Sequence, residues 1–562
     1  MIPARFGLTL AVVSALTACA GPEGKVGPAG PAGPRSDASP VLPDSSRDAA
    51  WPVDLSPIPA DLDPADLDPA DLPTDSNQPP DASGLSLDAS GIDPLDPCAD
   101  RAWPPRFGGV ASSVVDEETA TRWLDYRASR EADGFSEAAD PSSAALRFRL
   151  PDLALDGACL STDALVDLGR ELFLRRFTAA EGFGPRTEAN GLARLQSGPA
   201  LGPDAARCAD CHWKGGFAGG GDRADLAYLF GDGDDILTSE PRNAPALWGA
   251  GWVEALAAEM TSELHTQRDL ALAQVDAQGA PVNARFETHG VEFGTYRVSR
   301  GLDGSAQVAV PPSGFIDADL VVRPFGWRGD FATLEDFVRD SFGRHFGLQA
   351  SAGDADGDGV ELEIQDGQVN AVVAFIGTLD VPGIQVPDQA GVFLFGIPGL
   401  VDFVTTPEYT ERFARGAALF VDLGCATCHI PFLRLRSPRL KVGSRLIDLE
   451  TEGARPVADR DEDGQYLVPL FSDLKRHHMG EHLSARGNDV YLTRRLWGVA
   501  QTSPYLHDGS ATTIDEAVAK HGGRDSEAIA SALAFGAASD ADRASVRVFL
   551  DALRRAPSLR VP

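Results

Sequence analysis

The chain has 562 residues, of which 43% are apolar, and a formal net charge of -34. A chain of this length and composition can bury a large core and indicates two or more domains. The charge argues against a nucleic-acid partner, because phosphate binding needs a clustered basic surface, and it predicts an acidic, solvated exterior.

The N-terminus has the pattern of an export signal. Arg5 precedes an apolar run that is too short to span a membrane as a mature helix, so residues 1–18 are predicted to be a signal peptide. The sequence LTAC at 16–19 resembles the lipobox of bacterial lipoproteins, which implies that Cys19 is a lipid anchor. Cleavage of an ordinary signal peptide nearby is the alternative, and both place the protein outside the cytoplasm. Ala20 resembles the sorting residue of outer-membrane lipoproteins, so we expect an exported lipoprotein on the periplasmic side or cell surface.

Residues 19–100 are predicted to be a disordered linker. Residues 21–35 form a run of Gly-X-Y triplets that is short for a collagen triple helix. From 36 to 100 the one base is Arg47, and the pentad ADLDP is repeated. Such a density of proline and aspartate cannot build a core, so this segment is a tether without site residues.

The folded part is predicted to begin near Trp103. Apolar residues recur at helical spacing in four stretches, 165–177, 252–260, 334–346 and 369–379. Polar and apolar residues alternate in 280–325, which predicts strands. A second helical unit starts near Glu408. The sequence therefore predicts a mainly α fold with two domains, 101–395 and 396–562, and a small β insertion at about 265–325 in the first.

Two C-x-x-C-H motifs carry the strongest chemical signal. They are CADCH at 208–212 and CATCH at 425–429, and this is the attachment pattern of c-type haem. Two thiols bind the haem vinyl groups, and the adjacent histidine becomes the proximal iron ligand. One zinc ion shared by the four cysteines is the weaker alternative, because the two pairs are far apart in the chain. The predicted attachment residues are Cys208, Cys211, His212, Cys425, Cys428 and His429.

Two further cysteines, Cys98 and Cys159, remain after these assignments. In an oxidising compartment they are a plausible disulfide.

A short acidic helix near the C-terminus is predicted to turn a histidine inward. Thr513 and Glu516 form a capping-box pattern, and His521 lies on the same apolar face as Ile514 and Val518. Two glycines then end the helix, in a position where a positive φ is tolerated. An inward histidine is usually a hydrogen-bonded core residue. Beside a haem that needs a second axial ligand, we favour iron ligation.

Several motifs resemble those of bacterial di-haem cytochrome c peroxidases. They are RNAP at 242–245, WRGDFATLE at 327–335 and TSPYLHDG at 502–509. Three more are similar to the related di-haem oxidoreductases of the "thiol oxidoreductase" group, namely PLFSDLKRHHMG at 469–480, RRLWGVA at 494–500 and EAVAKHGG at 516–523. The resemblance covers roughly residues 164–553. It implies two cytochrome c-like haem domains.

The resemblance also implies roles for single residues near the C-terminal haem. His521 occupies the position of the distal methionine in the peroxidases, so this haem would be bis-histidine, His429/His521, and lower in potential. Trp327 matches the tryptophan between the two haems, an electron-hopping station, although a plain core aromatic is the alternative. Met479 matches a family position and is a second-choice ligand or a haem-edge residue.

One Ca²⁺ at the domain interface is a further implication of the resemblance. Its oxygen ligands would come from Asn243, Thr502 and the carbonyl group of Pro504. We expect His507 to belong to this interface and not to bind iron.

The chain departs from the peroxidases around the N-terminal haem. Residues 213–245 contain neither His nor Met, so the removable distal ligand is missing and the iron is expected to be open. Phe337 and Gly347 occupy the positions of the peroxidase glutamine and glutamate. His345 lies nearby, and a replacement base or sixth ligand is weighed evenly against a structural histidine.

Other polar features have no assigned role. His265, His289 and His482 lie outside all motifs and are predicted to be structural. Two acidic loops, 354–365 and 459–470, begin like calcium loops but lack the final bidentate glutamate, so acidic turns are favoured over weak calcium sites.

Three functions are consistent with these features. The first is a peroxidase-type oxidoreductase, in which peroxide reacts at an open N-terminal haem and a small cytochrome or cupredoxin supplies electrons. The second is an enzyme that oxidises a side chain of a protein or a metabolite. The third is a non-enzymatic electron carrier, with both irons six-coordinate.

Overall fold

The structure is a computed structural model that describes residues 161–178, 182–184, 195–197, 204–231, 235–311, 315–350, 363–382, 407–454 and 458–555. These residues all fall within one compact unit of the chain, Ile92–Pro562. The predicted signal peptide, Cys19, the linker, the Cys98–Cys159 pair and the domain boundary at 395/396 lie outside the described residues and stay predictions.

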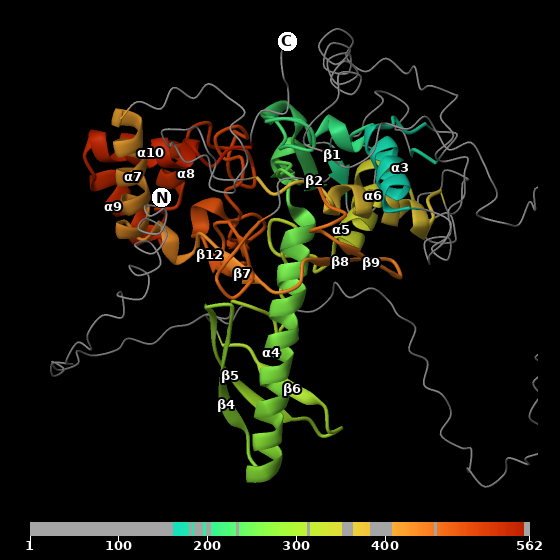
Figure 1. The fold of residues 1–562 in the computed structure, drawn as a ribbon, viewed down its shortest axis with the longest axis vertical. Coiled ribbons are helices and arrows are strands. Elements are labelled where there is room, and N and C mark those ends of the chain that lie inside the picture. The colour runs from blue at the N-terminus through green and yellow to red at the C-terminus, as the bar shows by residue number, and fades with distance from the viewer. Residues whose placement is uncertain are drawn as a thin grey trace, which may run out of the picture. The chain divides into compact units, whose positions relative to one another are not determined.

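Eight α-helices run through the described part of the chain (Figure 1). They are α3 (Thr162–Leu174), α4 (Ala250–Gln278), α5 (Leu334–Ser341), α6 (Asp366–Gly377), α7 (Pro407–Asp422), α8 (Ile514–Lys520), α9 (Ile529–Ala537) and α10 (Asp540–Asp551). Helices α3, α5 and α6 lie where the apolar periodicity predicted them. The predicted helix at 334–346 is α5 followed by a π-helical turn, Phe342–Phe346.

Thirteen short strands within the described residues pair into five small sheets. One sheet holds β1 (Leu195–Ser197), β2 (Ala227–Gly231) and β3 (Glu240–Arg242), and a second holds β4 (Val282–Thr288), β5 (Val291–Arg300) and β6 (Ala306–Ala309). A third pairs β10 (Asp459–Arg460), β11 (Tyr466–Val468) and β7 (Leu433–Leu435). The last two are β8 (Arg439–Val442) with β9 (Arg445–Asp448), and β12 (Arg476–His478) with β13 (Val490–Leu492). The fold is therefore helical with small sheets.

Two helix pairs use the same close packing, with a glycine at each contact. Helix α3 packs against α6, and α7 packs against α10. A Cβ atom added to Gly169 of α3 would lie 1.9 Å from the carbonyl oxygen of Ala371, and one added to Gly416 of α7 would lie 2.0 Å from that of Ser545. Glycine is required at both positions, because any side chain would collide with the backbone of the partner helix.

Phe173 and Phe420 each lie four residues after one of these glycines, in the shared sequence Gly-x-x-Leu-Phe. The ring of Phe173 lies 5.3 Å from a phenylalanine ring of α6, and the ring of Phe420 lies 5.3 Å from one of α10. Each ring also lies near the histidine of a C-x-x-C-H motif, at 6.3 Å from His212 and 6.5 Å from His429. The two halves of the chain thus repeat one arrangement of helix pair and motif histidine, which we did not detect from the sequence.

Replacing Gly416 with alanine should lower the free energy of unfolding by about 1–3 kcal/mol, the usual cost of overpacking a tight contact. The added methyl group has a backbone oxygen in its way and cannot be accommodated by a rotamer change. Gly536→Ala in α9 is the matched control, because nothing lies within 4 Å of its added Cβ. Urea unfolding of the haem-loaded protein measures both, and equal midpoints in the two variants would contradict the close contact.

The buried apolar residues form two cores. The larger one includes residues of α3, α4 and α6, and Cys208 and Cys211 pack against it. The smaller one is built from α7, α9 and α10, and Cys425 packs against it. Leu433, Leu440 and other residues of the β7–β11 region belong to the larger core, so the segment after residue 407 contributes to both. Each core therefore borders one C-x-x-C-H motif.

The β insertion packs along α4 (Figure 1). Strands β4–β6 form an antiparallel sheet within the range in which alternation predicted strands. Helix α4 runs to Gln278, so residues 265–278, which we had placed in the β insertion, are helical. The sequence underestimated this helix because, beyond Met260, its buried residues thin out to Leu264, Ala271, Leu272 and Val275 and leave a weak apolar pattern.

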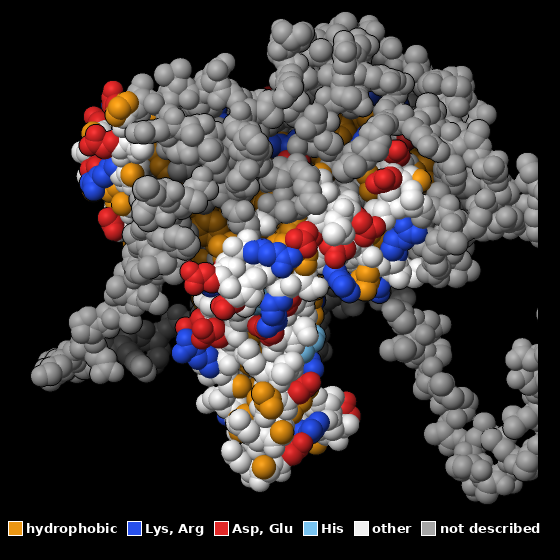
Figure 2. All heavy atoms as spheres, viewed as in Figure 1, with side chains coloured by type: hydrophobic (Ala, Val, Ile, Leu, Met, Phe, Trp, Pro, Cys, Tyr) orange, Lys and Arg blue, Asp and Glu red, His pale blue; other side chains and the backbone are white. Residues whose placement is uncertain are grey.

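The surface over α4 and the β4–β6 sheet carries charges of both signs (Figure 2). Lys and Arg side chains lie interspersed with Asp and Glu on this face. Within the described residues, no helix has the length and apolar character that crossing a membrane would require.

Candidate functional site

The two C-x-x-C-H motifs adopt the same local structure. Each forms a 3-10 turn, Cys208–Asp210 and Cys425–Thr427. The backbone N–H of each motif histidine then donates to the carbonyl oxygen of the first cysteine, at 3.1 Å for His212 and 3.0 Å for His429. One turn thus brings two thiols and an imidazole together, as covalent haem attachment requires.

Both motif histidines are held in the tautomer that suits an iron ligand. Nδ1 of His212 lies 3.2 Å from the carbonyl oxygen of Gly219, and Nδ1 of His429 lies 2.9 Å from that of Phe471. Burial lowers the pKa of each imidazole to about 4. Both rings are therefore neutral at pH 7, with the Nδ1 proton donated to the backbone and the Nε2 lone pair available to a metal.

His521 lies near His429 and is held in the same way. It follows α8 directly, and the predicted capping box of Thr513 and Glu516 is present. Its Nδ1 donates to the carbonyl oxygen of Ala517 at 2.7 Å, and burial lowers its pKa. The charged form of His521 also lowers the pKa of His429, so the two imidazoles lie within range of each other's charge. Two neutral imidazoles with available Nε2 atoms suit a bis-histidine haem.

The glycines after His521 do not act as the sequence predicted. Neither Gly522 nor Gly523 is among the described residues with positive φ. A Cβ atom on Gly523 would instead lie 1.9 Å from the ring of His482. The helix end needs a glycine because the backbone passes close to this ring.

A cavity of about 590 Å³ lies beside His212. Its size falls within the roughly 300–1,000 Å³ of pockets that bind organic ligands. Cys208 and Cys211 line it, together with apolar side chains, and its apolar wall includes Leu247, Phe325, Phe331, Leu334, Phe337 and Phe346. The cavity therefore has the attachment residues and the apolar walls that a haem group requires.

Arginines supply the positive charge of this cavity. Burial lowers the pKa of Arg494 to about 10 and that of Arg495 to about 9. Each donates to a backbone carbonyl group, of Gly326 and Ala246 respectively, and neither forms a salt bridge within the described residues. Buried cations of this kind fit an anionic group in the cavity, such as the propionates of a haem.

His345 lines the same cavity, from the π-helical turn after α5. Its Nδ1 lies 2.9 Å and 3.2 Å from the two carboxylate oxygens of Asp204. Burial would lower the pKa of His345, but the carboxylate outweighs burial and raises it. The charged form of His345 also lowers the pKa of His212, so the two rings lie within range of each other's charge. An anchored imidazole that lines the same cavity as His212 can move protons there.

Phe337 and Gly347 stand at the positions that the resemblance matches to the peroxidase glutamine and glutamate. Phe337 lines the cavity and supplies an apolar ring in place of an amide. Gly347 has a φ of 74°, and a Cβ atom there would lie 1.7 Å from the carbonyl oxygen of Gly184. A glutamate cannot occupy position 347 in this backbone.

Trp327 lies between the cavity and the C-terminal part of the chain. It lines the cavity, and its Nε1–H donates to the carbonyl oxygen of Asn243 at 2.8 Å. The guanidinium of Arg494 stacks on the indole at 4.8 Å, and the ring of His507 lies 6.4 Å away. His507 is buried, stacked on Tyr491 and 3.1 Å from its hydroxyl group. His507 thus lies between Trp327 and Tyr491, and its place at a domain interface stays a prediction.

Of the predicted calcium ligands, Asn243 and Pro504 are in direct contact. The side-chain amide of Asn243 donates to the carbonyl oxygen of Pro504 at 2.7 Å, and Thr502 donates its hydroxyl proton to Gly498. Oδ1 of Asn243 is buried and has no hydrogen-bond partner. Of the two acidic loops, residues 354–362 lie outside the described residues. In the second, Asp461 accepts from the backbone N–H groups of Asp463 and Gln465, as in an ordinary acidic turn.

Met479 is half-buried and does not line the described cavity. Its neighbour His477 bonds Asp473 at 2.9 Å and Glu527 at 2.8 Å. Burial would lower the pKa of His477, but hydrogen bonds with these carboxylates and with Cys428 raise it to about 11. The sequence did not predict a buried, charged histidine beside Cys428, because nothing in HHMG marks His477 as different from its neighbours.

Comparison with known proteins gives one family match. Residues 407–553 match the family described as "Di-haem oxidoreductase, putative peroxidase". A search of curated proteins finds no match. Within residues 407–553 this match agrees with the resemblance of the motifs to di-haem oxidoreductases, whereas the resemblance over residues 164–406 stays a prediction.

Two solved structures show a weaker likeness. One is a MauG-like protein associated with microbial copper homeostasis, at 19% identity and a TM-score of 0.24, over 47% of this chain and 79% of that chain. The other is Kuenenia stuttgartiensis hydrazine synthase, at 14% identity and a TM-score of 0.28, over 68% of this chain and 94% of that chain. TM-scores this low establish no common fold.

Proposed function

From the di-haem oxidoreductase match of residues 407–553, we propose that the protein is a peroxidase-type enzyme with two covalently bound c-type haems. Cys208, Cys211 and His212 would hold an N-terminal haem, at which peroxide would react. Cys425, Cys428, His429 and His521 would hold a C-terminal haem that would serve electron transfer. Bound in these sites, the haems supply irons that exchange single electrons and, at the open iron, a position where a peroxide O–O bond can be cleaved.

The observation that carries this proposal is the different anchoring of the two distal histidines. His521 is anchored by a neutral backbone carbonyl group, and its pKa is lowered, as suits a neutral ligand. His345 is anchored by the carboxylate of Asp204, and its pKa is raised. The second arrangement favours proton uptake over iron ligation, so His345 is assigned to acid/base chemistry.

His345 moves the protons of the reaction. Its Nε2 takes a proton from the peroxide and returns it to the departing oxygen, while Asp204 holds Nδ1 and stabilises the charged ring. Reduction of one hydrogen peroxide to two waters consumes two electrons and two protons, and the electrons come from an external donor such as a small cytochrome or cupredoxin. Arg494 and Arg495 hold the anionic edge of the haem, and the apolar wall limits water in the cavity.

Trp327 is proposed to relay electrons between the haems. Its indole is fixed by the hydrogen bond to Asn243 and by stacking with Arg494, so its position does not vary. It lies where the cavity meets the interface around His507. An aromatic ring held in this place shortens each electron-transfer step.

The test is peroxide turnover by the haem-loaded full chain with a small reduced c-type cytochrome as donor. We expect two equivalents of donor to be oxidised for each hydrogen peroxide consumed. Absence of peroxide-dependent donor oxidation by protein with both haems attached would overturn the peroxidase assignment. Oxidation of a protein or metabolite side chain in the same assay would favour the alternative enzyme class.

Calcium binding at the interface is a second part of the proposal. The buried Oδ1 of Asn243, which has no hydrogen-bond partner, supports a hard cation ligated by Asn243, Thr502 and Pro504. Chelation of calcium should therefore slow electron transfer to the N-terminal haem, because the interface that holds Trp327 loosens. The wild type and Asn243→Ala are each dialysed against calcium, and the calcium bound per chain is measured. The variant should bind less, and equal calcium content in the two proteins would exclude the site.

A further inference from the structure

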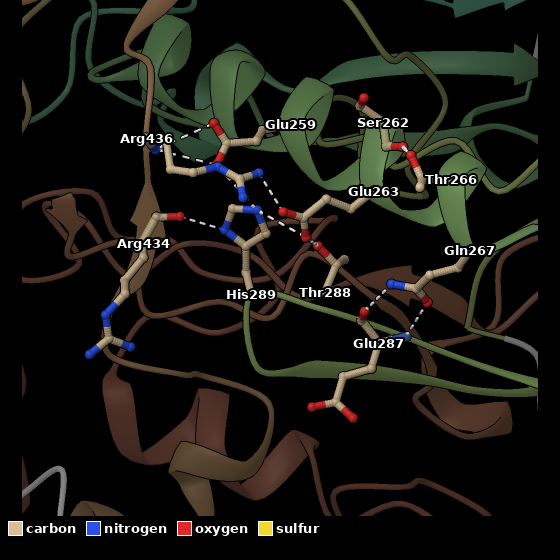
Figure 3. Close-up of polar contacts among 10 residues, drawn as sticks. All are labelled: Glu259, Ser262, Glu263, Thr266, Gln267, Glu287, Thr288, His289, Arg434 and Arg436. Atoms are coloured by element: carbon tan, nitrogen blue, oxygen red, sulfur yellow. Dashed lines mark hydrogen bonds and ion pairs between the residues drawn. The ribbon is translucent and has the colours of Figure 1, made fainter. Parts of the chain in front are cut away.

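A polar cluster away from the C-x-x-C-H motifs lies where the β insertion meets α4 (Figure 3). Glu259 and Glu263 lie one helical turn apart on α4 and face His289, in the turn between β4 and β5. Nε2 of His289 lies 3.4 Å from a carboxylate oxygen of Glu259 and 3.7 Å from one of Glu263. The three ligand atoms all lie within 4.8 Å of one another, so one ion could contact them all.

His289 is fixed by its backbone and by its other ring nitrogen. Its φ is 53°, in the left-handed region, and Nδ1 donates to the carbonyl oxygen of Arg434 in β7. Its side chain is only 5% exposed, and its Nε2 is buried without a hydrogen-bond partner. A buried polar atom of this kind calls for an explanation. With Nδ1–H donated to a carbonyl group, the neutral ring presents the Nε2 lone pair to the carboxylates, as metal-binding histidines do.

In the absence of a metal ion, Arg436 neutralises the charge of Glu259 and Glu263. Its guanidinium lies 3.0 Å from Glu259 and also contacts Glu263, which accepts from the hydroxyl group of Thr288. Both contacts favour the ionised carboxylate of Glu263. The Arg436 side chain is 54% exposed and can move into solvent. It is therefore a removable competitor for the position between the carboxylates.

We propose that Glu259, Glu263 and His289 bind a divalent first-row transition-metal ion of the Zn²⁺ type, which displaces the guanidinium of Arg436. Two carboxylates and an imidazole suit zinc and its neighbours, whereas Ca²⁺ and Mg²⁺ prefer oxygen ligands alone. The ion would join α4 to the β4–β5 turn. Through the hydrogen bond from His289 to Arg434, it would also join both to the strand β7. The prediction of a purely structural His289 is thereby revised.

Zinc binding to the haem-loaded full chain tests the proposal. Equilibrium dialysis against Zn²⁺, with elemental analysis, gives the zinc bound per chain and its affinity. His289→Asn removes the ligand with a residue that tolerates positive φ, and Glu263→Gln removes a ligand charge with almost no change of shape. Each should weaken one zinc site by more than about tenfold, since even outer partners of a metal contribute that much. Arg436→Ala should tighten the same site, because it removes the competing cation.

The control is His265→Asn, on the same helix, where the imidazole bonds the carbonyl group of Asp319 and faces no carboxylate pair. It should leave zinc binding unchanged. If the cluster is an ion-pair network only, then wild type, His289→Asn and Glu263→Gln will bind the same amount of zinc, and this result would overturn the proposal. Unchanged or weaker binding in Arg436→Ala would overturn the displacement of the guanidinium. Haem absorption and circular dichroism verify that each variant is folded.

Discussion

Replacing His521 with alanine should convert the C-terminal haem from low spin to high spin. His429 would remain as a ligand, but the second imidazole near it would be gone, leaving the iron five-coordinate or with water. His482 also lies near His521, but its Nε2 bonds the carbonyl oxygen of Lys520, so we expect no replacement imidazole. Electron paramagnetic resonance and optical spectra of the oxidised variant measure it, and the haem reduction potential should rise with loss of the second histidine.

His507→Phe is the matched control for this variant. His507 is also buried and lies in the same motif region, but it stacks on Tyr491 and bonds the tyrosine hydroxyl group. A phenyl ring keeps the stacking and removes the hydrogen bond, so the interface should weaken while both haem spectra stay as in the wild type. A low-spin C-terminal haem in His521→Ala, or a high-spin one in His507→Phe, would contradict the assignment of the ligand.

Replacing His345 with glutamine should lower the rate of peroxide reduction by about 10²–10⁴-fold, the usual contribution of a positioned acid/base group. Glutamine keeps the polarity and approximate size of the side chain but cannot carry the proton between the two peroxide oxygens. Haem content and the spectrum of the C-terminal haem should not change, because His345 lies at the other motif. Stopped-flow kinetics with peroxide and reduced protein measure the loss.

Asp204→Asn separates proton transfer by His345 from a purely structural role. In the wild type the carboxylate raises the pKa of His345 against the effect of burial. The neutral, basic form of the ring therefore accumulates only as the pH rises through this raised pKa. Without the carboxylate, burial alone acts and the pKa falls, so the rising limb of the rate-pH profile should shift to lower pH. An unshifted profile would remove His345 from the proton-transfer step.

The sequence predicted the parts of the site that depend on local patterns. The two C-x-x-C-H motifs identified the residues of the two 3-10 turns. The capping box of Thr513 and Glu516 correctly located the start of α8. The motifs that contain Trp327 and His507 lie together, with the two rings 6.4 Å apart. Each of these signals lies within a few residues of the chain, where spacing and side-chain chemistry determine the geometry.

Features that join distant segments could not be predicted in this way. Asp204 holds His345 from a position 141 residues earlier, and no periodicity connects the two. Gly523 is required by the ring of His482, which approaches from a different segment, and not by its own φ. His289 lacks any motif, and its relation to Glu259 and Glu263 arises from the packing of a hairpin turn on α4. The Gly-x-x-Leu-Phe repeat was visible in the sequence, but its meaning depends on which helices pack together.

The central claim is that the two haems differ, with one open iron and one bis-histidine iron. The most direct test is the electron paramagnetic resonance spectrum of the oxidised, haem-loaded protein, recorded with and without hydrogen peroxide. The account predicts one high-spin signal and one low-spin signal, with the high-spin signal lost or altered on addition of peroxide. Two low-spin signals that peroxide leaves unchanged would contradict it and would identify the protein as an electron carrier.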